Sequence, residues 1–203
     1  MRVYVATTNP GKLREMEQLF AVAPFTLATY DGYLAPIEGD VSYAENAALK
    51  ARTLHQQLER AGLPGNVLAD DSGLEVAALD RRPGVLTAFY GGAELPWDRR
   101  RAHLLEELAA APDGNIDRRA RFVCALHFVD LHGREFASLA TVEGEIADRE
   151  RGARGFSFDP VFVYPPLGRT FAELSAEEKN RVSHRASAAA GLIAAIVHAG
   201  AGR

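Results

Sequence analysis

Residues 2–20, with the sequence RVYVATTNPGKLREMEQLF, indicate the kind of fold. The apolar run over residues 2–7 predicts a strand, and the residues TNPG that follow predict a tight turn. A strand that leads through a turn into a helix is typical of proteins in which the two element types alternate. The helix is predicted from about residue 12 to residue 20, because its apolar side chains recur at helical spacing: Leu13, Met16, Leu19 and Phe20.

The rest of the chain continues this alternation. A second helix is predicted from Ser42, which forms a capping-box pattern with Glu45. It presents a face of mostly small residues: Ala44, Ala47, Ala48, Ala51 and Leu58. The later predicted elements are strands over residues 66–70 and 74–79, a helix over 101–111, and strands over 119–129 and 135–146. A last helix is predicted after Ser175, which forms a second capping box with Glu178, and it continues through Ile196.

These elements predict a mixed α/β fold. The chain contains no internal repeat, low-complexity run or long linker. Residues 1–203 are therefore predicted to form a single domain.

Composition and charge exclude several classes of protein. The 203 residues carry 27 acidic and 23 basic side chains, and the net charge of −4 argues against a nucleic-acid binder, which neutralises phosphates with a basic face. No stretch reaches the roughly 18–20 apolar residues that span a bilayer, and residues 1–11 lack the apolar core of a signal peptide. The single cysteine, Cys124, cannot form an internal disulfide. We therefore expect no stable binding to nucleic acid, no membrane partner and a cytoplasmic location.

The basic residues are divided unevenly between two types. Twenty are arginine and three are lysine, namely Lys12, Lys50 and Lys179. A compositional bias of the genome accounts for such a ratio but does not say where lysines remain. Because a compact ammonium fits where a planar guanidinium does not, these three positions are candidates for tight sites.

Two segments of the first half combine a turn with charged residues. In TTNPGK, residues 7–12, the N–H groups and dipole of a helix start favour an anion, although an ordinary capped helix looks similar and no G-x-x-x-x-G-K-[ST] loop is present. In ADDSG, residues 69–73, two carboxylates follow a predicted strand end. One of them could hold Mg²⁺ while the other caps the turn, or both could belong to an ordinary acid-rich turn.

Two segments of the second half are also candidates for a site. GFSFDPVF, residues 155–162, is an aromatic turn that either offers a stacking face to a flat base or fills the core. On the predicted last helix, Lys179, Ser183 and His184 fall on nearby faces and could converge. A histidine on a helix is, however, more often an ordinary surface or core residue.

Together these segments closely resemble the inosine triphosphate pyrophosphatase family, the Ham1-like noncanonical purine nucleoside triphosphate pyrophosphatases. The matching segments occur in the family's order over almost the whole chain. They are TTNPGKLRE (7–15), SYAENAALKA (42–51), LADDSGLEV (68–76), RRPGVLTAFYGG (81–92), RGFSFDPVF (154–162) and KNRVSHR (179–185).

The resemblance implies a fold and a set of site residues. The fold is an elongated, two-lobed mixed α/β architecture with a long twisted sheet, flanking helices and a central substrate cleft, and the protein is a homodimer. Asp71 is implied as general base and Mg²⁺ ligand, and Glu38, which precedes the second helix, as a further metal ligand. The implied substrate-binding residues are Thr7, Thr8, Asn9, Pro10, Gly11, Lys12, Lys50, Ser72, Phe156, Ser157, Phe158, Asp159, Lys179, His184 and Arg185.

The implied reaction is hydrolysis of ITP, dITP and XTP to the monophosphate and pyrophosphate, which cleanses the nucleotide pool of deaminated purines. Mg²⁺ would polarise the phosphoryl oxygens, Asp71 would accept a proton from the attacking water, and the three lysines would stabilise the departing pyrophosphate. Donors from His184, Arg185 or loop N–H groups would pair with the oxygen at position 6 of the base. The amino group of adenine would be left unpaired there.

Four positions depart from the family's usual pattern. Ser157 stands where glycine is common, and Phe158 where tyrosine is frequent; Thr87 and Phe89 replace a common serine and arginine. The phosphate and metal positions are kept, so these departures concern the fit of the base pocket.

Two other functions remain open from the sequence. One is a Maf-like pyrophosphatase that acts on modified pyrimidine triphosphates, which a panel of substrates would distinguish. The other is a nucleotide-binding or regulatory module without turnover, against which the intact Asp71 and Lys12 argue.

Overall fold

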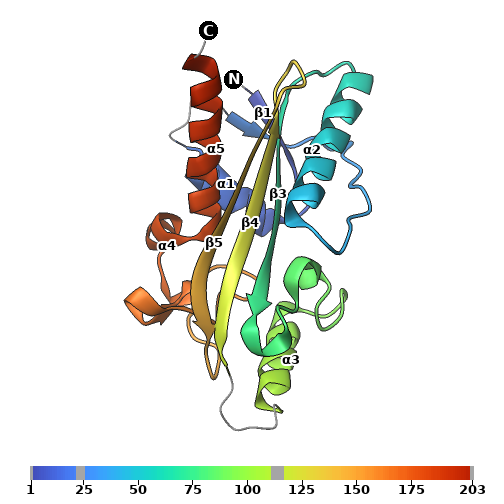
Figure 1. Ribbon diagram of the computed structural model, residues 1–203. Helices are drawn as coiled ribbons and strands as arrows, with labels where there is room; N and C mark the ends of the chain where they lie inside the picture. The colour runs from blue at the N-terminus through green and yellow to red at the C-terminus, as the bar shows by residue number, and fades with distance from the viewer. Residues whose placement is uncertain (1, 22–25, 111–116, 202–203) are drawn as a thin grey trace. The chain divides into compact units, whose positions relative to one another are not determined.

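The computed structural model describes residues 2–21, 26–110 and 117–201 (Figure 1). The strands are β1 (Arg2–Ala6), β2 (Thr26–Ala28), β3 (Asn66–Val76), β4 (Arg119–Val129), β5 (Glu135–Ile146), β6 (Phe162–Tyr164) and β7 (Arg169–Thr170). The α-helices are α1 (Pro10–Leu19), α2 (Tyr43–Arg60), α3 (Trp97–Ala109), α4 (Ala176–Val182) and α5 (His184–Ala201). None of the described helices is long and apolar enough to cross a membrane.

The strands form one seven-stranded sheet in the order β2-β1-β3-β4-β5-β6-β7. β1 pairs in parallel with β2 and β3, whereas β6 is antiparallel to β5 and β7. The sheet is therefore mixed, and the predicted mixed α/β class is confirmed.

The chain divides into two compact units. Unit 1 contains Met1–Asp71, Cys124–Ala140 and His184–Arg203, and unit 2 contains Ser72–Val123 and Thr141–Ser183. β3, β4 and β5 each contribute residues to both units. The single domain over residues 1–203 stays a prediction, and each unit has its own apolar core.

In unit 1, helices cover both faces of the sheet (Figure 1). Successive residues of a strand point to opposite faces, and β1 shows the consequence. Val3 and Val5 pack in a cluster with residues of α1 and α5, whereas Tyr4 and Ala6 pack in another with residues of α2. α1 and α5 thus cover one face, and α2 covers the other.

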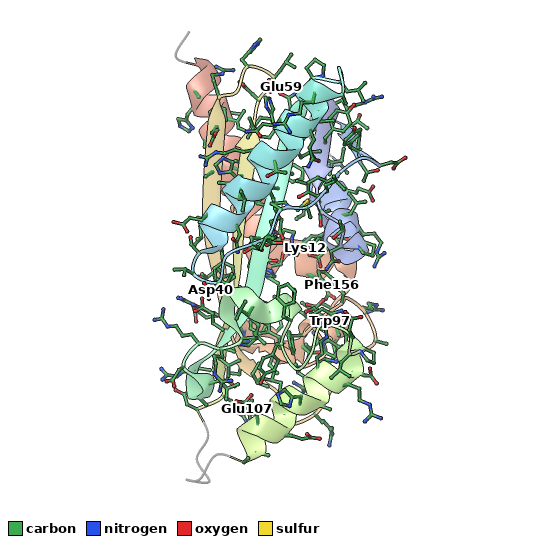
Figure 2. The ribbon with its side chains drawn as sticks, turned by 90° about the vertical axis from the view of Figure 1, so that its right-hand side faces the viewer. Lys12, Asp40, Glu59, Trp97, Glu107 and Phe156 are labelled. Carbon is green, nitrogen blue, oxygen red and sulfur yellow. The ribbon has the colours of Figure 1, made fainter. Side chains whose placement is uncertain are left out.

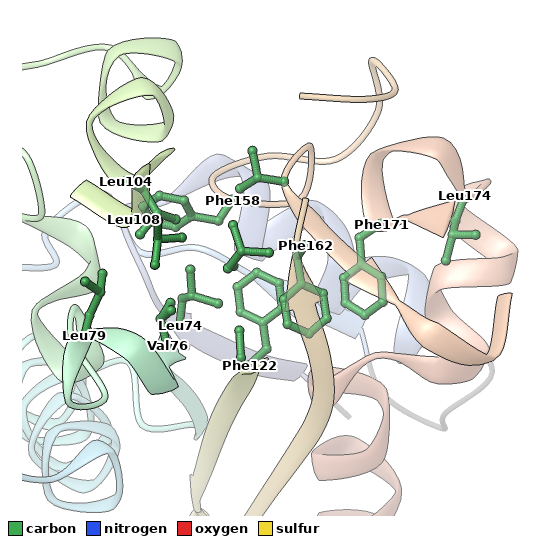
Figure 3. Packing of buried hydrophobic residues seen from close by; sticks show 13 residues of the cluster. Leu74, Val76, Leu79, Leu104, Leu108, Phe122, Phe158, Phe162, Phe171 and Leu174 are labelled. Carbon is green, nitrogen blue, oxygen red and sulfur yellow. The ribbon is translucent and has the colours of Figure 1, made fainter. Parts of the chain in front are cut away.

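The core of unit 2 is rich in aromatic residues (Figure 3). The ring of Phe162 lies 4.4 Å from that of Phe122 and 5.0 Å from that of Phe171, measured between centroids. Leu104 and Leu108 of α3 are fully buried in the same cluster. Each such side chain contributes about 1.5–3 kcal/mol when it leaves water, so this cluster accounts for much of the stability of unit 2.

Several predicted elements are confirmed and others shift at their ends. β4 and β5 coincide with the predicted strands over residues 119–129 and 135–146. α1 begins two residues before the predicted start and α3 four residues before its own, while residue 111 lies outside the described residues. Ser42 caps α2 by accepting a hydrogen bond from the backbone N–H of Glu45, as the sequence predicts. Of the predicted face of α2, Ala44 is exposed and the other four residues are buried.

The prediction of two strands over residues 66–70 and 74–79 is wrong. A single strand, β3, runs from Asn66 to Val76, and the last three residues form a 3₁₀ turn. Asp70 and Asp71 therefore lie within a strand and not at its end. Buried carboxylates are tolerated there because each is paired with cationic side chains, as described below.

The prediction of one continuous last helix is also wrong. The capping box between Ser175 and Glu178 is present, but α4 ends at Val182. Ser183 has φ −78° and ψ 154°, an extended conformation that interrupts the helical hydrogen bonds before α5 begins. Lys179 consequently belongs to unit 2 and His184 to unit 1, so one helix does not carry both.

Ser157 has φ 56°, in the left-handed region that favours glycine. We expect Ser157→Gly to raise the free energy of unfolding by about 0.5–1 kcal/mol, because glycine avoids a strain of about 1–2 kcal/mol and loses somewhat more backbone entropy. Urea-induced unfolding would measure the change. Ser157→Ala, which keeps the strain, is the control and should stay near the parent; a Gly variant no more stable than the Ala variant would contradict the expectation.

Candidate active site

Asp70 and Asp71 are neighbours in β3, and their side chains point to opposite faces of the sheet. The preceding residues show which face is which, since Leu68 packs with α1 and α5, and Ala69 with α2. Asp70 therefore lies on the face covered by α1 and α5, and Asp71 on the face covered by α2. Both are buried, with exposed fractions of 1% and 5%.

Asp70 is the centre of a buried network of charges. Its Oδ1 lies 2.5 Å from Nζ of Lys12, and its Oδ2 accepts hydrogen bonds from Nε of Arg185 at 2.9 Å and from the thiol of Cys124 at 3.1 Å. Nη1 of Arg185 also donates to Glu15 of α1. Burial opposes ionisation of Asp70, but the charges of Arg185 and Lys12 outweigh it and hold the pKa of this carboxyl well below its usual value.

The thiol of Cys124 is completely buried. Burial and the nearby Asp70 carboxylate raise its pKa well above the usual value for a thiol. Cys124 is thus a protonated hydrogen-bond donor in the Asp70 network.

Asp71 is held on both carboxylate oxygens by side chains of α2. Nζ of Lys50 donates to its Oδ1 at 2.8 Å, and Nδ2 of Asn46 donates to its Oδ2 at 3.3 Å. Lys50 also donates to Oε2 of Glu38 at 2.8 Å. Burial raises the pKa of Asp71, and the charges of Lys50 and Lys12 offset only part of this effect. A carboxylate with a raised pKa is suited to accept a proton.

The register of α2 explains this arrangement. Asn46 and Lys50 are four residues apart, so they lie on the same side of the helix, one turn from each other. Glu38 belongs to the loop that leads into α2, in which Figure 2 labels Asp40. α2 therefore supplies both described contacts to the Asp71 carboxylate, and Lys50 joins Glu38 of the preceding loop to them.

The turn before α1 is used for helix capping. Oδ1 of Asn9 accepts hydrogen bonds from the N–H groups of Gly11 at 2.8 Å and Lys12 at 3.3 Å, and the N–H of Asn9 donates to Oγ1 of Thr7 at 3.1 Å. Pro10 occupies the first position of the helix. Figure 2 labels Lys12 close to this helix start. Binding of phosphate by these residues, Thr8 included, stays a prediction.

Three candidate residues of unit 2 contact one another. Oδ2 of Asp159 accepts hydrogen bonds from Nζ of Lys179 at 2.6 Å and from the N–H of Phe156 at 2.7 Å. Nζ of Lys179 lies 5.1 Å from the ring centroid of Phe156, close enough for a cation–π interaction. Figure 2 labels Phe156 and also Trp97, whose ring meets that of Phe158 edge to face at 5.5 Å between centroids. Phe158 is fully buried and belongs to the core of unit 2.

The predicted site residues are thus divided between the units. Unit 1 brings Lys12, Glu38, Lys50, Asp71 and Arg185 into the two networks around β3, whereas Ser72 begins unit 2. Each of the three lysines forms an ion pair. Lys12 pairs with Asp70, Lys50 with Glu38 and Asp71, and Lys179 with Asp159.

Sequence reasoning missed two residues near Asp71. Asn46 lies inside a helix, and its signal was only its place in the segment SYAENAALKA. Tyr33 has a buried hydroxyl without a hydrogen-bond partner in the described part of the chain. Burial raises the pKa of Tyr33 to about 12, with Lys50 lowering and Glu38 raising it. This hydroxyl therefore lies within the electrostatic influence of Lys50 and Glu38.

The chemistry of these donors fits a divalent cation. Asp71 and Glu38 each direct one oxygen at the same ammonium of Lys50, so the two carboxylates already converge on one positive charge. Among the described residues there is no cluster of three or more His, Cys, Asp or Glu suited to a metal. Two carboxylates suffice for Mg²⁺, which takes its other ligands from water and substrate phosphates.

Comparisons with known proteins agree with one another. Residues 3–195 match the model of the Ham1 family. A dITP/XTP pyrophosphatase from Exiguobacterium sp. is 41% identical over 201 residues, 97% of each chain, and one from Thermus thermophilus is 43% identical over 197 residues, 96% of this chain and 91% of that protein.

Solved structures give the same result. A HAM1 protein from Coxiella burnetii matches with a TM-score of 0.81 and 33% identity, over 98% of this chain and 99% of the other. A nucleoside-triphosphatase, or dITP/XTP pyrophosphatase, from Mycobacterium abscessus matches with a TM-score of 0.70 and 37% identity, over 95% and 99% of the two chains.

Proposed function

The chain belongs to the Ham1 family, and on this basis we propose that it is a nucleoside triphosphate pyrophosphohydrolase. Its substrates are the noncanonical purine nucleotides dITP, XTP and ITP, and its products are the monophosphate and pyrophosphate. The observation that carries the proposal is the buried Asp71, whose pKa is raised and which shares a cationic partner with Glu38. The activity would remove deaminated purines from the nucleotide pool before polymerases use them.

Asp71 is proposed as the general base that accepts the proton of the attacking water. Lys12 and Lys50 lie on either side of β3, where they supply positive charge for the phosphates and for the pyrophosphate that leaves. Thr7, Thr8 and the residues up to Gly11 are proposed to line the phosphate end. Both lysines are already held by carboxylates, so their charges are oriented before a substrate binds.

Hydrolysis of nucleoside triphosphates generally uses a divalent metal, and Mg²⁺ is proposed here. Asp71 and Glu38 would hold it, and when bound it would neutralise phosphate charge and lower the pKa of a water ligand.

Further contacts to the substrate are proposed for Ser72, the loop from Phe156 to Asp159, Lys179, His184 and Arg185, with Lys179 stabilising the departing pyrophosphate. Support differs between these residues. Phe156 is half-buried, with the Lys179 ammonium over its ring, whereas Phe158 is a core residue. Arg185 is 1% exposed and already binds two carboxylates. A role of Arg185 toward the base therefore rests on the family resemblance alone.

Pyrophosphate release, measured with Mg²⁺ over ATP, GTP, ITP, dITP, XTP and modified pyrimidine triphosphates, tests the proposal. We expect rates on ITP, dITP and XTP at least about 100-fold above those on ATP, as the amino group of adenine left unpaired in the pocket rejects that base. Equal rates on ATP and ITP would contradict the proposed substrate class. A preference for modified pyrimidines would indicate a Maf-like enzyme, and binding without release would indicate a regulatory module.

Lys179→Arg is expected to lower kcat/KM about 10-fold although the charge is kept, as expected for the loss of one charge-assisted hydrogen bond. Lys179 is 5% exposed and lies against Asp159 and Phe156, so a wider guanidinium does not fit the same place. Steady-state kinetics would measure the change, and Lys12→Arg should behave similarly. Arg181→Lys, in an exposed pair on the same helix, is the control. A Lys179→Arg enzyme as active as this control would contradict the expectation.

A homodimer and a cytoplasmic location are also proposed. Unit 1 has an apolar groove of about 500 Å³ lined by residues of α2, β4 and β5, and Leu139 on its border is 57% exposed. A second copy would cover such a surface, and light scattering that gives the mass of one chain would contradict this. The cytoplasmic location is supported by the proposed substrates, which belong to the pool that polymerases draw on.

A further inference from the structure

Asn46 is an unusual residue at its position in α2. Its side chain is only 3% exposed, in the second turn of the helix. Asparagine is a poor residue for a helix interior, because its side chain competes for backbone hydrogen bonds, and burying its amide is costly unless all its polar atoms find partners. A specific set of contacts must therefore compensate for its presence.

The amide of Asn46 has three partners. Its Oδ1 accepts a hydrogen bond from the N–H of Gly39 at 2.8 Å, and its Nδ2 donates to the carbonyl of Gly39 at 2.9 Å and to Oδ2 of Asp71 at 3.3 Å. These partners fix the orientation of the amide, because only nitrogen can donate to a carbonyl and a carboxylate. The side chain thus connects the backbone beside Glu38 with the carboxylate of Asp71.

Asn46 in this way aligns Glu38 with Asp71, although the two are more than 30 residues apart in the sequence. Gly39 follows Glu38 directly, so a clamp on both polar groups of Gly39 also limits where Glu38 can lie. Lys50, one turn further along α2, then binds Glu38 and the other oxygen of Asp71. Asn46 and Lys50 together leave the Asp71 carboxylate little freedom to rotate.

We propose that Asn46 is a positioning residue for the reaction, which sets the orientation of Asp71 and the place of Glu38 relative to it. The proposal rests on the proposed function of this site. Asn46 itself does not touch the reacting atoms. Partners that orient the ligands of a metal or the side chains of a site typically change affinity or activity by about 10–100-fold when they are removed.

The same helix provides a matched control. Gln57 clamps the backbone of Leu34 in the same loop, with its Oε1 accepting from the N–H at 3.1 Å and its Nε2 donating to the carbonyl at 2.8 Å. Gln57 has no described contact with Asp71. If Asn46 served only to anchor the loop, Asn46→Ala and Gln57→Ala would have similar effects.

The experiment compares Asn46→Ala, Asn46→Asp and Gln57→Ala in the full chain. We expect both Asn46 variants to lower kcat on the best substrate by about 10–100-fold, and Gln57→Ala to stay within about 3-fold of the parent. Asn46→Asp keeps the size of the side chain but faces the Gly39 carbonyl and Asp71 with an acceptor, so it removes both donated hydrogen bonds without leaving a cavity. Gly39→Ala should be nearly neutral, because an added Cβ has its nearest neighbour at 3.7 Å.

A second readout separates positioning from loss of fold. Calorimetric binding of Mg²⁺ in the presence of the product monophosphate should weaken by about 10-fold or more in Asn46→Ala and stay unchanged in Gln57→Ala. Equal kcat and equal Mg²⁺ binding in Asn46→Ala and Gln57→Ala would overturn the positioning role. A parent protein that releases no pyrophosphate from any nucleotide would instead overturn the proposed function.

Discussion

Asp71→Asn is expected to lower kcat for pyrophosphate release by about 100- to 10,000-fold, the range attributed to a general base. Asparagine has nearly the same shape as aspartate but cannot accept the proton. Because Lys12 and the turn before α1 are unchanged, the affinity for the nucleotide should fall much less than kcat. Kinetics together with calorimetric binding of the nucleotide would measure both quantities.

Glu75→Gln is a suitable control for this variant. Glu75 is also an acid of β3 with a cationic partner, since it forms an ion pair with Arg121 at 2.8 Å, but it lies outside the Asp71 network. It should keep nearly the full rate. If Asp71→Asn also kept it, Asp71 would not be the base.

Arg185→Ala is expected to lower the free energy of unfolding by about 3–5 kcal/mol, because it leaves a buried carboxylate without one of its cationic partners. Both Arg185 and Asp70 are 1% exposed. Lys12 and Cys124 would remain on Asp70 but would not replace the lost charge. Urea-induced unfolding, followed by circular dichroism, would measure the difference.

Arg52→Ala provides the comparison for Arg185→Ala. Arg52 forms an ion pair with Glu135 at 2.7 Å, but its side chain is 57% exposed. Exposed ion pairs contribute about 1 kcal/mol or less, so this variant should be nearly as stable as the parent. Similar losses in the two variants would contradict the stabilising role assigned to the buried network.

Those parts of the fold that depend on local pattern could be predicted from the sequence. The continuous apolar character of β4 and the capping residues Ser42 and Ser175 are local signals, and the structure confirms all three. The break at Ser183 has no such signal, because the apolar spacing of α5 continues that of α4 and no proline or glycine marks the boundary.

The continuation of β3 through Asp70 and Asp71 depends on distant residues. Two adjacent acids indicate a turn when only their neighbours are considered. Lys50 and Arg185, which neutralise them, come from other elements of unit 1. Their pairing with the acids appears only after the chain has folded.

The residues of the candidate site could be predicted from the sequence, but the hydrogen bonds and ion pairs that join them could not. The family resemblance predicts Asp71, Glu38 and the three lysines as a group. The motif segments give no indication that Asn46 ties Gly39 to Asp71, because an asparagine within a helix has no distinctive spacing. They also give no indication that the Arg185 guanidinium binds Asp70 and Glu15.

Because Cys124 is buried, its reaction with a thiol reagent can report local opening of unit 1. This thiol is the only one in the sequence, is completely enclosed and donates to Asp70. A thiol reagent can modify it only when the surrounding elements of unit 1 separate, since reaction needs an exposed thiolate. The rate of labelling in native buffer therefore measures how often this part of the molecule opens, without an introduced probe.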